Sequence, residues 1–235
     1  MRVSEKYRVP LRYRLIRPLM KIVFRGLFHI LGRIKITGKE NVPYGKSYVV
    51  AMNHISIFDP PLIAAFWPEM LEIMGAAEVF GKPGQGPLLK LYGVMRVHRG
   101  EVERTLLTRI ISLIKSGRPF LIAPEGGRSH VVAMRRAKPG IAYIVEHTGV
   151  PVIPVGLVGT TDDFWQRAKR GDRPSLEMRI GKPFMLPPVE GKGGERHEAR
   201  QRNADLVMSH LAGILPEDYR GVYADSAITP AQAGH

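Results

Sequence analysis

Apolar residues crowd the chain between Leu11 and Leu31, and beyond Gly38 short strand-like runs alternate with helical runs. Short continuous apolar runs are typical of buried strands, whereas apolar residues spaced by three or four are typical of helices. The predicted strands are 47–52, 71–76, 94–98, 118–123, 150–158 and 176–180, and the predicted helices are 60–66, 101–116, 141–148 and 195–214. This order predicts an α/β fold, a single domain with a mixed, partly parallel sheet flanked by helices, preceded by an N-terminal amphipathic helical segment.

The apolar run V-P-V-I-P-V-G-L-V at 150–158 contains two prolines. Because proline cannot donate a ladder hydrogen bond, the run is predicted to be an edge or irregular strand and not a central one. The expected organisation is a helical segment over 1–35, a folded domain over 36–222 and a disordered tail over 223–235. The sequence shows no internal repeat and no second domain.

The cations of the N-terminal segment recur every three or four residues and therefore fall along one side of a helix. They are Arg14, Arg17, Lys21 and Arg25, followed by His29. A basic stripe beside a broad apolar face predicts an interfacial membrane anchor, in which each cation contributes about 1 kcal/mol on an anionic surface. The alternative is a helix packed on its own domain with the basic face in water.

The net charge of +14 predicts an anionic partner, and both nucleic acid and an anionic lipid surface fit that sum. No zinc finger, RNA-recognition motif or interleaving of basic and aromatic residues favours nucleic acid. No run approaches the length that spans a bilayer, and no histidine spacing predicts a metal site. The chain has no cysteine, which excludes disulfides and a cysteine nucleophile. The expected partner is thus an anionic membrane surface and not nucleic acid.

The stretch N-H-I-S-I-F-D-P places His54 five residues before Asp59, at the end of a predicted strand. A hydroxyl is a poor nucleophile until a base takes its proton, and histidine suits that role at neutral pH. A carboxylate on the other ring nitrogen would fix the tautomer and stabilise the imidazolium. The alternatives are that Asp59 caps the following helix and that His54 is a turn residue.

Two further elements carry arginines and glycines. P-E-G-G-R-S, residues 124–129, follows a predicted strand, and its glycines allow the backbone to approach a ligand while Arg128 offers a fork for phosphate. G-V-M-R-V-H-R, residues 93–99, contains Arg96 and ends at Arg99. The alternatives are a surface turn with a solvated arginine and an edge strand with basic outer residues.

In this order, His-x4-Asp, Gly-x5-Arg, Pro-Glu-Gly-x-Arg-Ser and V-P-V-I-P-V, the four elements resemble those of the lysophosphatidic acid (1-acyl-glycerol-3-phosphate) acyltransferases and the wider glycerolipid acyltransferase superfamily. The resemblance covers roughly residues 36–222, and the closing L-P-E-D-Y-R-G at 215–221 is also similar. Arg96, Ala123 and Gly127 depart from the usual residues of the family, which bears on the identity of the acceptor.

The resemblance implies a role for each matching residue. It implies that His54 and Asp59 are catalytic, and that the acceptor phosphate is bound by Arg99, Glu125, Gly126 and Arg128. Accessory positions are Asn53, Arg96, Ser129, Lys138, Gly140 and Pro154.

The implied activity is transfer of a fatty acyl group from acyl-CoA or acyl carrier protein to a hydroxyl of 1-acyl-glycerol-3-phosphate, forming phosphatidic acid. No cofactor and no metal are expected, since the thioester is a co-substrate. The expected location is the cytoplasmic face of a membrane, as a peripheral or monotopic protein. The alternatives are another acceptor, such as glycerol-3-phosphate, another lysophospholipid or a glycolipid precursor, and a non-catalytic basic binding protein.

Overall fold

A computed structural model describes residues 7–98 and 104–229 of the chain, and its secondary structure agrees with most of the predicted elements. The strands are β1 (Arg33–Thr37), β2 (Val49–Met52), β3 (Glu72–Ala76), β4 (Met95–Val97), β5 (Phe120–Ile122), β6 (Val152–Val158) and β7 (Ser175–Ile180). The α-helices are α1 (Leu11–Leu31), α2 (Asp59–Phe66), α3 (Gln85–Tyr92), α4 (Arg104–Lys115), α5 (Gly140–Thr148), α6 (Phe164–Lys169), α7 (Gly193–Ile214) and α8 (Glu217–Arg220). Short 3-10 helices are η1 (Lys39–Asn41), η2 (Ala77–Gly81) and η3 (Gly221–Tyr223).

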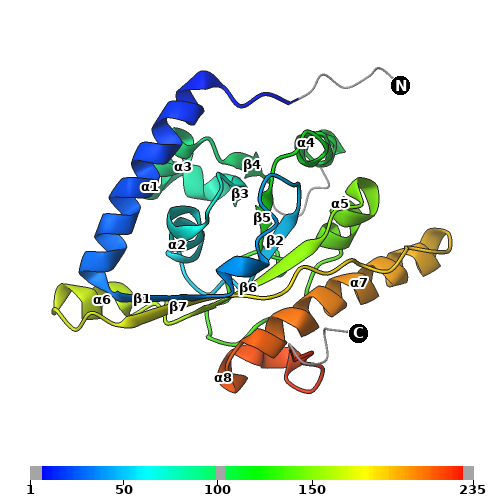
Figure 1. The fold of residues 1–235 in the computed structure, drawn as a ribbon. Helices are drawn as coiled ribbons and strands as arrows, with labels where there is room; N and C mark the ends of the chain where they lie inside the picture. Colours follow the sequence, from blue (N-terminus) through cyan, green and yellow to red (C-terminus); the bar gives the residue numbers. More distant parts are fainter. Residues whose placement is uncertain (1–6, 99–103, 230–235) are drawn as a thin grey trace.

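The strands form one seven-stranded sheet in the order β1-β7-β6-β2-β5-β3-β4. Neighbouring strands from β6 to β4 are parallel, β7 is antiparallel to β6, and β1 is parallel to β7. Helices α1, α2 and α3 cover one face of the sheet, and α4, α5 and α7 cover the other (Figure 1). A separate apolar core fills the space on each side. The predicted α/β fold with a mixed, mostly parallel sheet is confirmed.

The prediction that 150–158 forms an edge strand is wrong, because β6 lies between β7 and β2 in the middle of the sheet. Pro154 is tolerated there because it lies opposite Gly181, one residue past the Val155–Ile180 pair that ends the ladder with β7. The Gly181 N–H donates to the Pro154 carbonyl at 2.9 Å, and the missing side chain of Gly181 leaves room for the proline ring. A proline at the end of a ladder costs only one hydrogen bond.

Helix α1 turns most of its cations toward the protein, contrary to the alternative that its basic face lies in water. The guanidinium of Arg17 is buried, the Lys21 ammonium donates to the carbonyls of Trp67 and Pro68, and the Arg25 Nε donates to the Ala65 carbonyl at 2.6 Å. These carbonyls lie at the C-terminal end of α2, where a helix lacks internal partners and carries partial negative charge. Of the four, Arg17 is buried and Lys21 is partly buried, whereas Arg14 and Arg25 remain exposed, Arg25 with its Nε bound to the protein.

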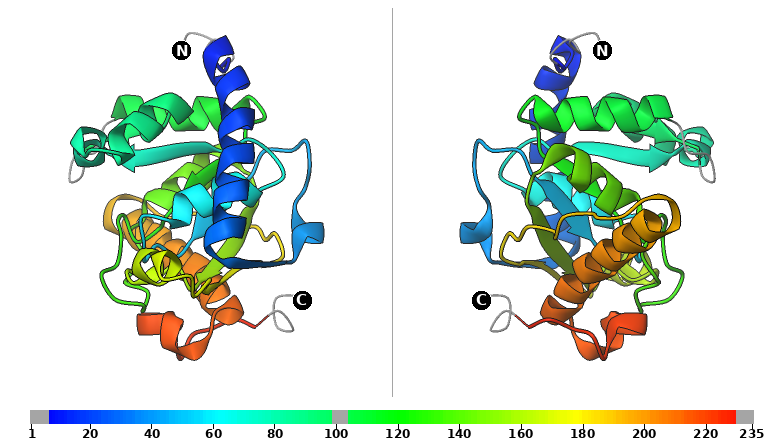
Figure 2. Two further views of the ribbon diagram at one scale, coloured as in Figure 1. Left: turned by 90° about the vertical axis from the view of Figure 1, so that its left-hand side faces the viewer. Right: turned by 90° about the vertical axis from the view of Figure 1, so that its right-hand side faces the viewer.

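The outer face of α1 is apolar. Seven large apolar side chains, each between 42% and 71% exposed, follow one side of the helix: Leu11, Leu15, Leu19, Ile22, Val23, Leu27 and Ile30. No other described element lies over this face in the view that looks onto it (Figure 2, left). The described helices include none that is long and apolar enough to cross a membrane. The helix is therefore amphipathic with its polar side inward and its apolar side outward.

Several local features differ from the sequence-based expectations. Strand β1, whose R-I-K-I-T alternation is a strand signal, crosses the expected boundary at residue 35. Helix α3 forms over residues for which no helix or strand was predicted. The expected disordered tail is ordered over 223–229, because Tyr223 is buried and its hydroxyl donates to Asp205 on α7 at 2.6 Å. In the same segment, the Ile228 N–H donates to the Ser209 carbonyl at 2.9 Å.

Candidate active site

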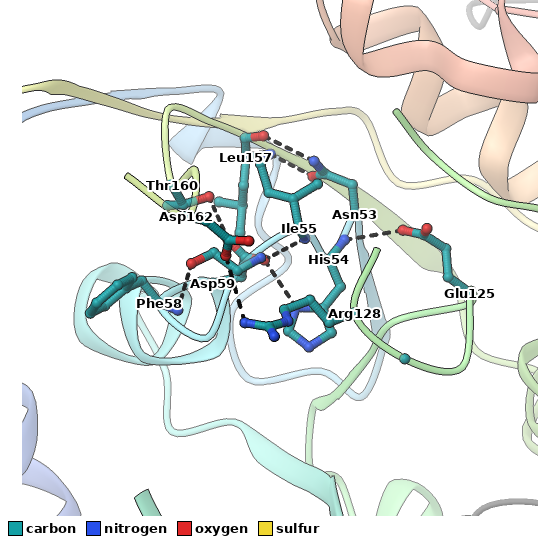
Figure 3. Close-up of polar contacts among 12 residues, drawn as sticks. Asn53, His54, Ile55, Phe58, Asp59, Glu125, Arg128, Leu157, Thr160 and Asp162 are labelled. Atoms are coloured by element: carbon teal, nitrogen blue, oxygen red, sulfur yellow. Dashed lines mark hydrogen bonds and ion pairs between the residues drawn. The ribbon is translucent and has the colours of Figure 1, made fainter. Parts of the chain in front are cut away.

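The candidate site lies where three strands of the sheet end. The loop 53–58 follows β2, the loop 123–129 follows β5, and the loop 159–163 follows β6 (Figure 3). These strands are adjacent and parallel, so their carboxyl ends meet at one edge of the sheet. Ligand sites in open α/β sheets typically lie at this edge.

His54 and Asp59 form the predicted pair, with 2.9 Å between Nδ1 of His54 and Oδ2 of Asp59. Asp59 is buried and His54 is 18% exposed. Because the carboxylate accepts, Nδ1 carries the proton in the neutral tautomer assigned from this network, and Nε2 is left to accept a proton from a ligand. The arrangement is that of a base oriented by a carboxylate.

Asp59 is held by three further donors. The backbone N–H groups of Ile55 and Ser56 donate to Oδ2 at 2.7 Å each, and the hydroxyl of buried Thr160 donates to Oδ1 at 2.5 Å. Asp59 is the first residue of α2, yet its carboxylate binds the turn that precedes the helix and not the free N–H groups of the helix itself. Asp59 therefore does not cap the helix. The turn before α2 brings its carboxylate back to His54.

Asn53 fixes the residue before His54 to the neighbouring strand. Its side-chain amide donates to the Leu157 carbonyl at 2.9 Å and accepts from the Leu157 N–H at 2.7 Å. This two-point contact extends the pairing of β2 with β6 beyond the last strand residue, Met52. Asn53 thus positions the loop and does not face a ligand.

Glu125 is buried, and both of its carboxylate oxygens bind backbone N–H groups. Oε1 accepts from the His54 N–H at 3.1 Å, and Oε2 accepts from the Arg135 N–H at 2.9 Å. Burial raises the pKa of the Glu125 carboxyl, while the two N–H donors and the Arg135 guanidinium oppose that rise. From the sequence, Glu125 is predicted to be among the residues that bind the acceptor phosphate. In the structure its carboxylate connects the loops after β2 and β5, so its role is to hold these loops together.

The rest of the 124–129 loop is shaped around two positions. Gly126 has a φ of +73°, and a Cβ there would lie 2.7 Å from the Lys138 side chain that passes over it. Glycine adopts this backbone without strain, and a side chain there would force the Lys138 side chain to move. Ser129 is buried, with its N–H donating to the His54 carbonyl at 2.7 Å and its hydroxyl donating to the Ala133 carbonyl at 3.1 Å. Ser129 therefore joins the two loops and is not a nucleophile.

Of the two arginines predicted to bind the acceptor phosphate, Arg128 lies within the described residues. Its Nη1 is 3.6 Å from Oδ1 of Asp162, and the two side chains are 29% and 63% exposed (Figure 3). The pair is partly open to water, so it is weak and can be replaced by another anion. Arg128 is thus available for a ligand phosphate.

The remaining predicted residues lie elsewhere or outside the described residues. Arg99 lies outside them, and Arg96 is exposed on β4 with its guanidinium 4.6 Å from the Phe80 ring centroid. Gly140 is the first residue of α5, and Pro154 is buried within β6. Of the described residues 7–98 and 104–229, no group of three or more His, Asp or Glu side chains could hold a metal ion.

Thr160 and Asp162 belong to the site and were not found from the sequence. Thr160 is 101 residues from Asp59, and no local pattern joins the two. The available signal was the polar run T-T-D-D, residues 160–163, directly after the apolar strand β6. A polar run after a parallel strand marks the same edge of the sheet as His54.

Comparisons with known proteins agree on one family. The family model described as Acyltransferase matches residues 33–158. The 1-acyl-sn-glycerol-3-phosphate acyltransferase of Borreliella burgdorferi is 27% identical over 134 residues, which cover 56% of this chain and 54% of that protein. The lyso-ornithine lipid O-acyltransferase of Pseudomonas aeruginosa is 27% identical over 178 residues, covering 68% and 66%. The chain therefore spans between about half and two thirds of the length of these two relatives.

Two further similarities extend over more of the chain. The 1-acyl-sn-glycerol-3-phosphate acyltransferase of Bacillus subtilis is 24% identical over 190 residues, covering 77% of this chain and 91% of that protein. The crystal structure of the 1-acyl-sn-glycerophosphate acyltransferase PlsC from Thermotoga maritima superposes with a TM-score of 0.59 and 22% identity, over 83% of this chain and 79% of that chain. The structural likeness supports the fold.

Proposed function

The chain belongs to the acyltransferase family, and from that premise we propose that it transfers a fatty acyl group from a thioester to the free hydroxyl of 1-acyl-glycerol-3-phosphate, forming phosphatidic acid. The single observation that supports this most is the His54–Asp59 pair, at 2.9 Å, with Arg128 on the neighbouring loop. A base for the hydroxyl and a cation for the phosphate are the two groups that this acceptor requires. The two relatives named above as 1-acyl-sn-glycerol-3-phosphate acyltransferases align with 56% and 77% of this chain.

The proposed reaction is a direct transfer without an acyl-enzyme. Nε2 of His54 takes the proton of the acceptor hydroxyl as its oxygen attacks the thioester carbonyl carbon. The new C–O bond forms, the tetrahedral intermediate collapses with cleavage of the C–S bond, and His54 returns the proton to the leaving thiolate. Asp59 stabilises the imidazolium between these steps. General base catalysis of this kind contributes about 10²–10⁴-fold to the rate.

Arg128 binds the acceptor phosphate in this proposal, and Arg99 remains a prediction from the family pattern. The thioester donor is acyl-CoA or acyl carrier protein, and the reaction uses no other cofactor. Asn53 holds the backbone just before His54, Glu125 accepts from the His54 N–H itself, and neither contacts the acceptor in this proposal.

The experiment is product analysis by mass spectrometry after mixing the purified protein with acyl-CoA or acyl carrier protein and lysophosphatidic acid. The wild type should form phosphatidic acid, and His54→Ala should reduce the rate by about 10²-fold or more. His197→Ala, which changes an exposed histidine on α7, is the matched control. Equal rates in the two variants would refute the mechanism.

A second acceptor class is supported by one observation. Asp162 places an exposed carboxylate beside Arg128, so the site offers an anionic group as well as a cationic one. An acceptor with an amino-acid headgroup, as in the name of the Pseudomonas relative, would match that pair of charges. Including lyso-ornithine lipid in the acceptor panel separates the two: a faster reaction with it than with lysophosphatidic acid would reassign the substrate.

We also propose that the apolar outer face of α1 lies in the surface of a membrane, at its cytoplasmic face, as in a peripheral or monotopic protein. Seven exposed apolar side chains on one helix form a patch of the kind that marks membrane contact. The substrates are lipids, so attachment brings the site to them. Leu19→Glu with Ile22→Glu should abolish flotation with vesicles, whereas Val222→Glu, an equally exposed position on η3, should not. Equal flotation of both variants would contradict this role of α1.

A further inference from the structure

A cavity of about 340 Å³ lies between the end of α1, strand β1 and the end of α2. Its lining residues are Arg25, His29, Ile34, Ile36, Lys39 and Phe66. It is separate from the candidate active site, since none of its lining residues belongs to the loops that follow β2, β5 and β6. The cavity is of a size that takes a phosphate group and the atoms next to it.

The polar lining of the cavity is basic. Arg25, His29 and Lys39 contribute side chains, and no acid is among the lining residues. In residues 7–98 and 104–229, none of these three side chains forms an ion pair with a carboxylate. Two full cations and a titratable imidazole around one opening attract an anion.

Arg25 is held in place before any ligand arrives. Its Nε donates to the Ala65 carbonyl at 2.6 Å, and its guanidinium carbon lies 5.9 Å from the Phe66 ring centroid. His29 contacts the same ring edge-to-face at 5.3 Å. A guanidinium fixed through Nε still has both terminal nitrogens to donate, the geometry suited to a phosphate. The fixed side chain also loses less entropy when it binds.

The other lining residues, Ile34, Ile36 and Phe66, are apolar. Basic groups beside an apolar wall suit an amphiphile, whose phosphate contacts the cations while its glycerol carbons contact the wall. The exposed side chains of Ile22 and Ile30 lie on the same helix within three residues of Arg25 and His29. The cavity therefore lies beside the apolar stripe of α1, where a phospholipid headgroup would be found.

We propose that this cavity binds the phosphate headgroup of an anionic phospholipid of the membrane, separately from the acceptor in the active site. The proposal rests on the membrane contact of α1 proposed above. It explains why Arg25 and His29, at the end of the basic stripe, line an opening, whereas Arg17 and Lys21 are bound by the protein interior. The surface then distinguishes anionic from neutral lipid, which an apolar stripe alone does not.

The test compares flotation of the full chain with phosphatidylcholine vesicles and with vesicles that also contain phosphatidylglycerol. The wild type should prefer the anionic vesicles, and Lys39→Gln should reduce that preference by about fivefold, the effect of about 1 kcal/mol for one cation. Lys46→Gln removes the same charge from an exposed lysine of the next turn, which does not line the cavity, and should change little. The Lys39 side chain is exposed, so its replacement removes little packing.

Each other outcome has one meaning. Equal losses in Lys39→Gln and Lys46→Gln would show general surface attraction and overturn the site, as would equal wild-type binding to both kinds of vesicle. Loss of the Lys39-dependent preference in millimolar inorganic phosphate, but not in chloride of matched ionic strength, would reassign the cavity to free phosphate. Failure of the wild type to bind any vesicle would refute the membrane contact of α1 itself and with it this proposal.

Discussion

Arg17 on α1 and Glu72 on β3 form a two-point ion pair, with nitrogen–oxygen distances of 2.7 and 2.9 Å and each side chain only 1% exposed. The Arg17 Nε also donates to the Tyr92 carbonyl at 2.8 Å, and Arg118 contacts Glu72 at 3.0 Å. The pair connects the N-terminal helix to the sheet across 55 residues of chain. Helix α1 is therefore part of the fold.

Replacing Arg17 should destabilise the protein, because Glu72 would lose its main partner in a buried position. Arg17→Ala is expected to lower the free energy of unfolding by about 3–5 kcal/mol, toward the lower end because Arg118 still reaches the carboxylate. Urea unfolding measures the change. Arg14→Ala, on the exposed side of the same helix, should change it by less than about 0.5 kcal/mol. Similar losses in both variants would contradict a specific role of the pair.

The hydroxyl of Thr160 should be needed to position Asp59. Thr160→Val keeps the shape and removes the donor to Oδ1, so kcat is expected to fall about tenfold while KM for the acceptor stays within about twofold. Thr160→Ser restores the donor and should recover most of the rate. A variant with lower stability and an unchanged kcat would show that the hydroxyl has a structural role alone.

Asp162 should compete with the acceptor phosphate for Arg128. Asp162→Asn removes a partly exposed partner whose ion pair contributes about 1 kcal/mol or less, so KM for lysophosphatidic acid is expected to fall by up to about fivefold. Steady-state kinetics measures this change. Asp163→Asn is the matched control, since the Asp163 carboxylate contacts Thr161 and Arg167 instead. A higher KM in Asp162→Asn would mean that the carboxylate itself binds the acceptor.

Glu125 should make stability depend on pH in a direction that follows from its burial. The pKa of its carboxyl is raised in the folded protein above the ordinary 4.5. In the pH window between 4.5 and the raised pKa, the folded state binds a proton that the unfolded chain does not. Stability therefore falls as pH rises through the window and is regained as pH falls. The difference in unfolding free energy between the wild type and Glu125→Gln should thus grow in favour of the wild type as pH is lowered toward 4.5.

The control for this measurement is Glu198→Gln, an exposed glutamate on α7 whose replacement should leave the pH profile parallel to that of the wild type. Urea unfolding at a series of pH values supplies the data for all three proteins. A difference between wild type and Glu125→Gln that shrinks as pH falls would contradict the raised pKa.

The contacts that could be predicted from the sequence are local ones. His54 and Asp59 are five residues apart, so one tight turn brings them together. Their spacing in the sequence was therefore enough to predict the contact. Asp59 also binds Thr160, and His54 is held by Glu125, partners 101 and 71 residues away that only the sheet brings close. Such contacts depend on strand order, which a single sequence does not determine.

The orientation of α1 could not be predicted for a different reason. Helical periodicity separates a polar side from an apolar side, but it does not say which of them meets the protein. In a protein surrounded only by water the apolar side packs inward. Here the cations pack inward because α2 ends in free carbonyls and Glu72 is buried nearby, neither of which the periodicity of α1 reveals.

The inward cations of α1 also determine which changes to this helix the fold can tolerate. The helix shares a buried ion pair and four main-chain carbonyl contacts with the domain, so its removal would leave Glu72 and these carbonyls without these partners. Truncation of α1 is therefore expected to destabilise the protein. Replacing the outer apolar side chains of α1 with polar ones, while leaving Arg17, Lys21 and Arg25 unchanged, would keep these contacts and remove only the surface proposed to meet the membrane.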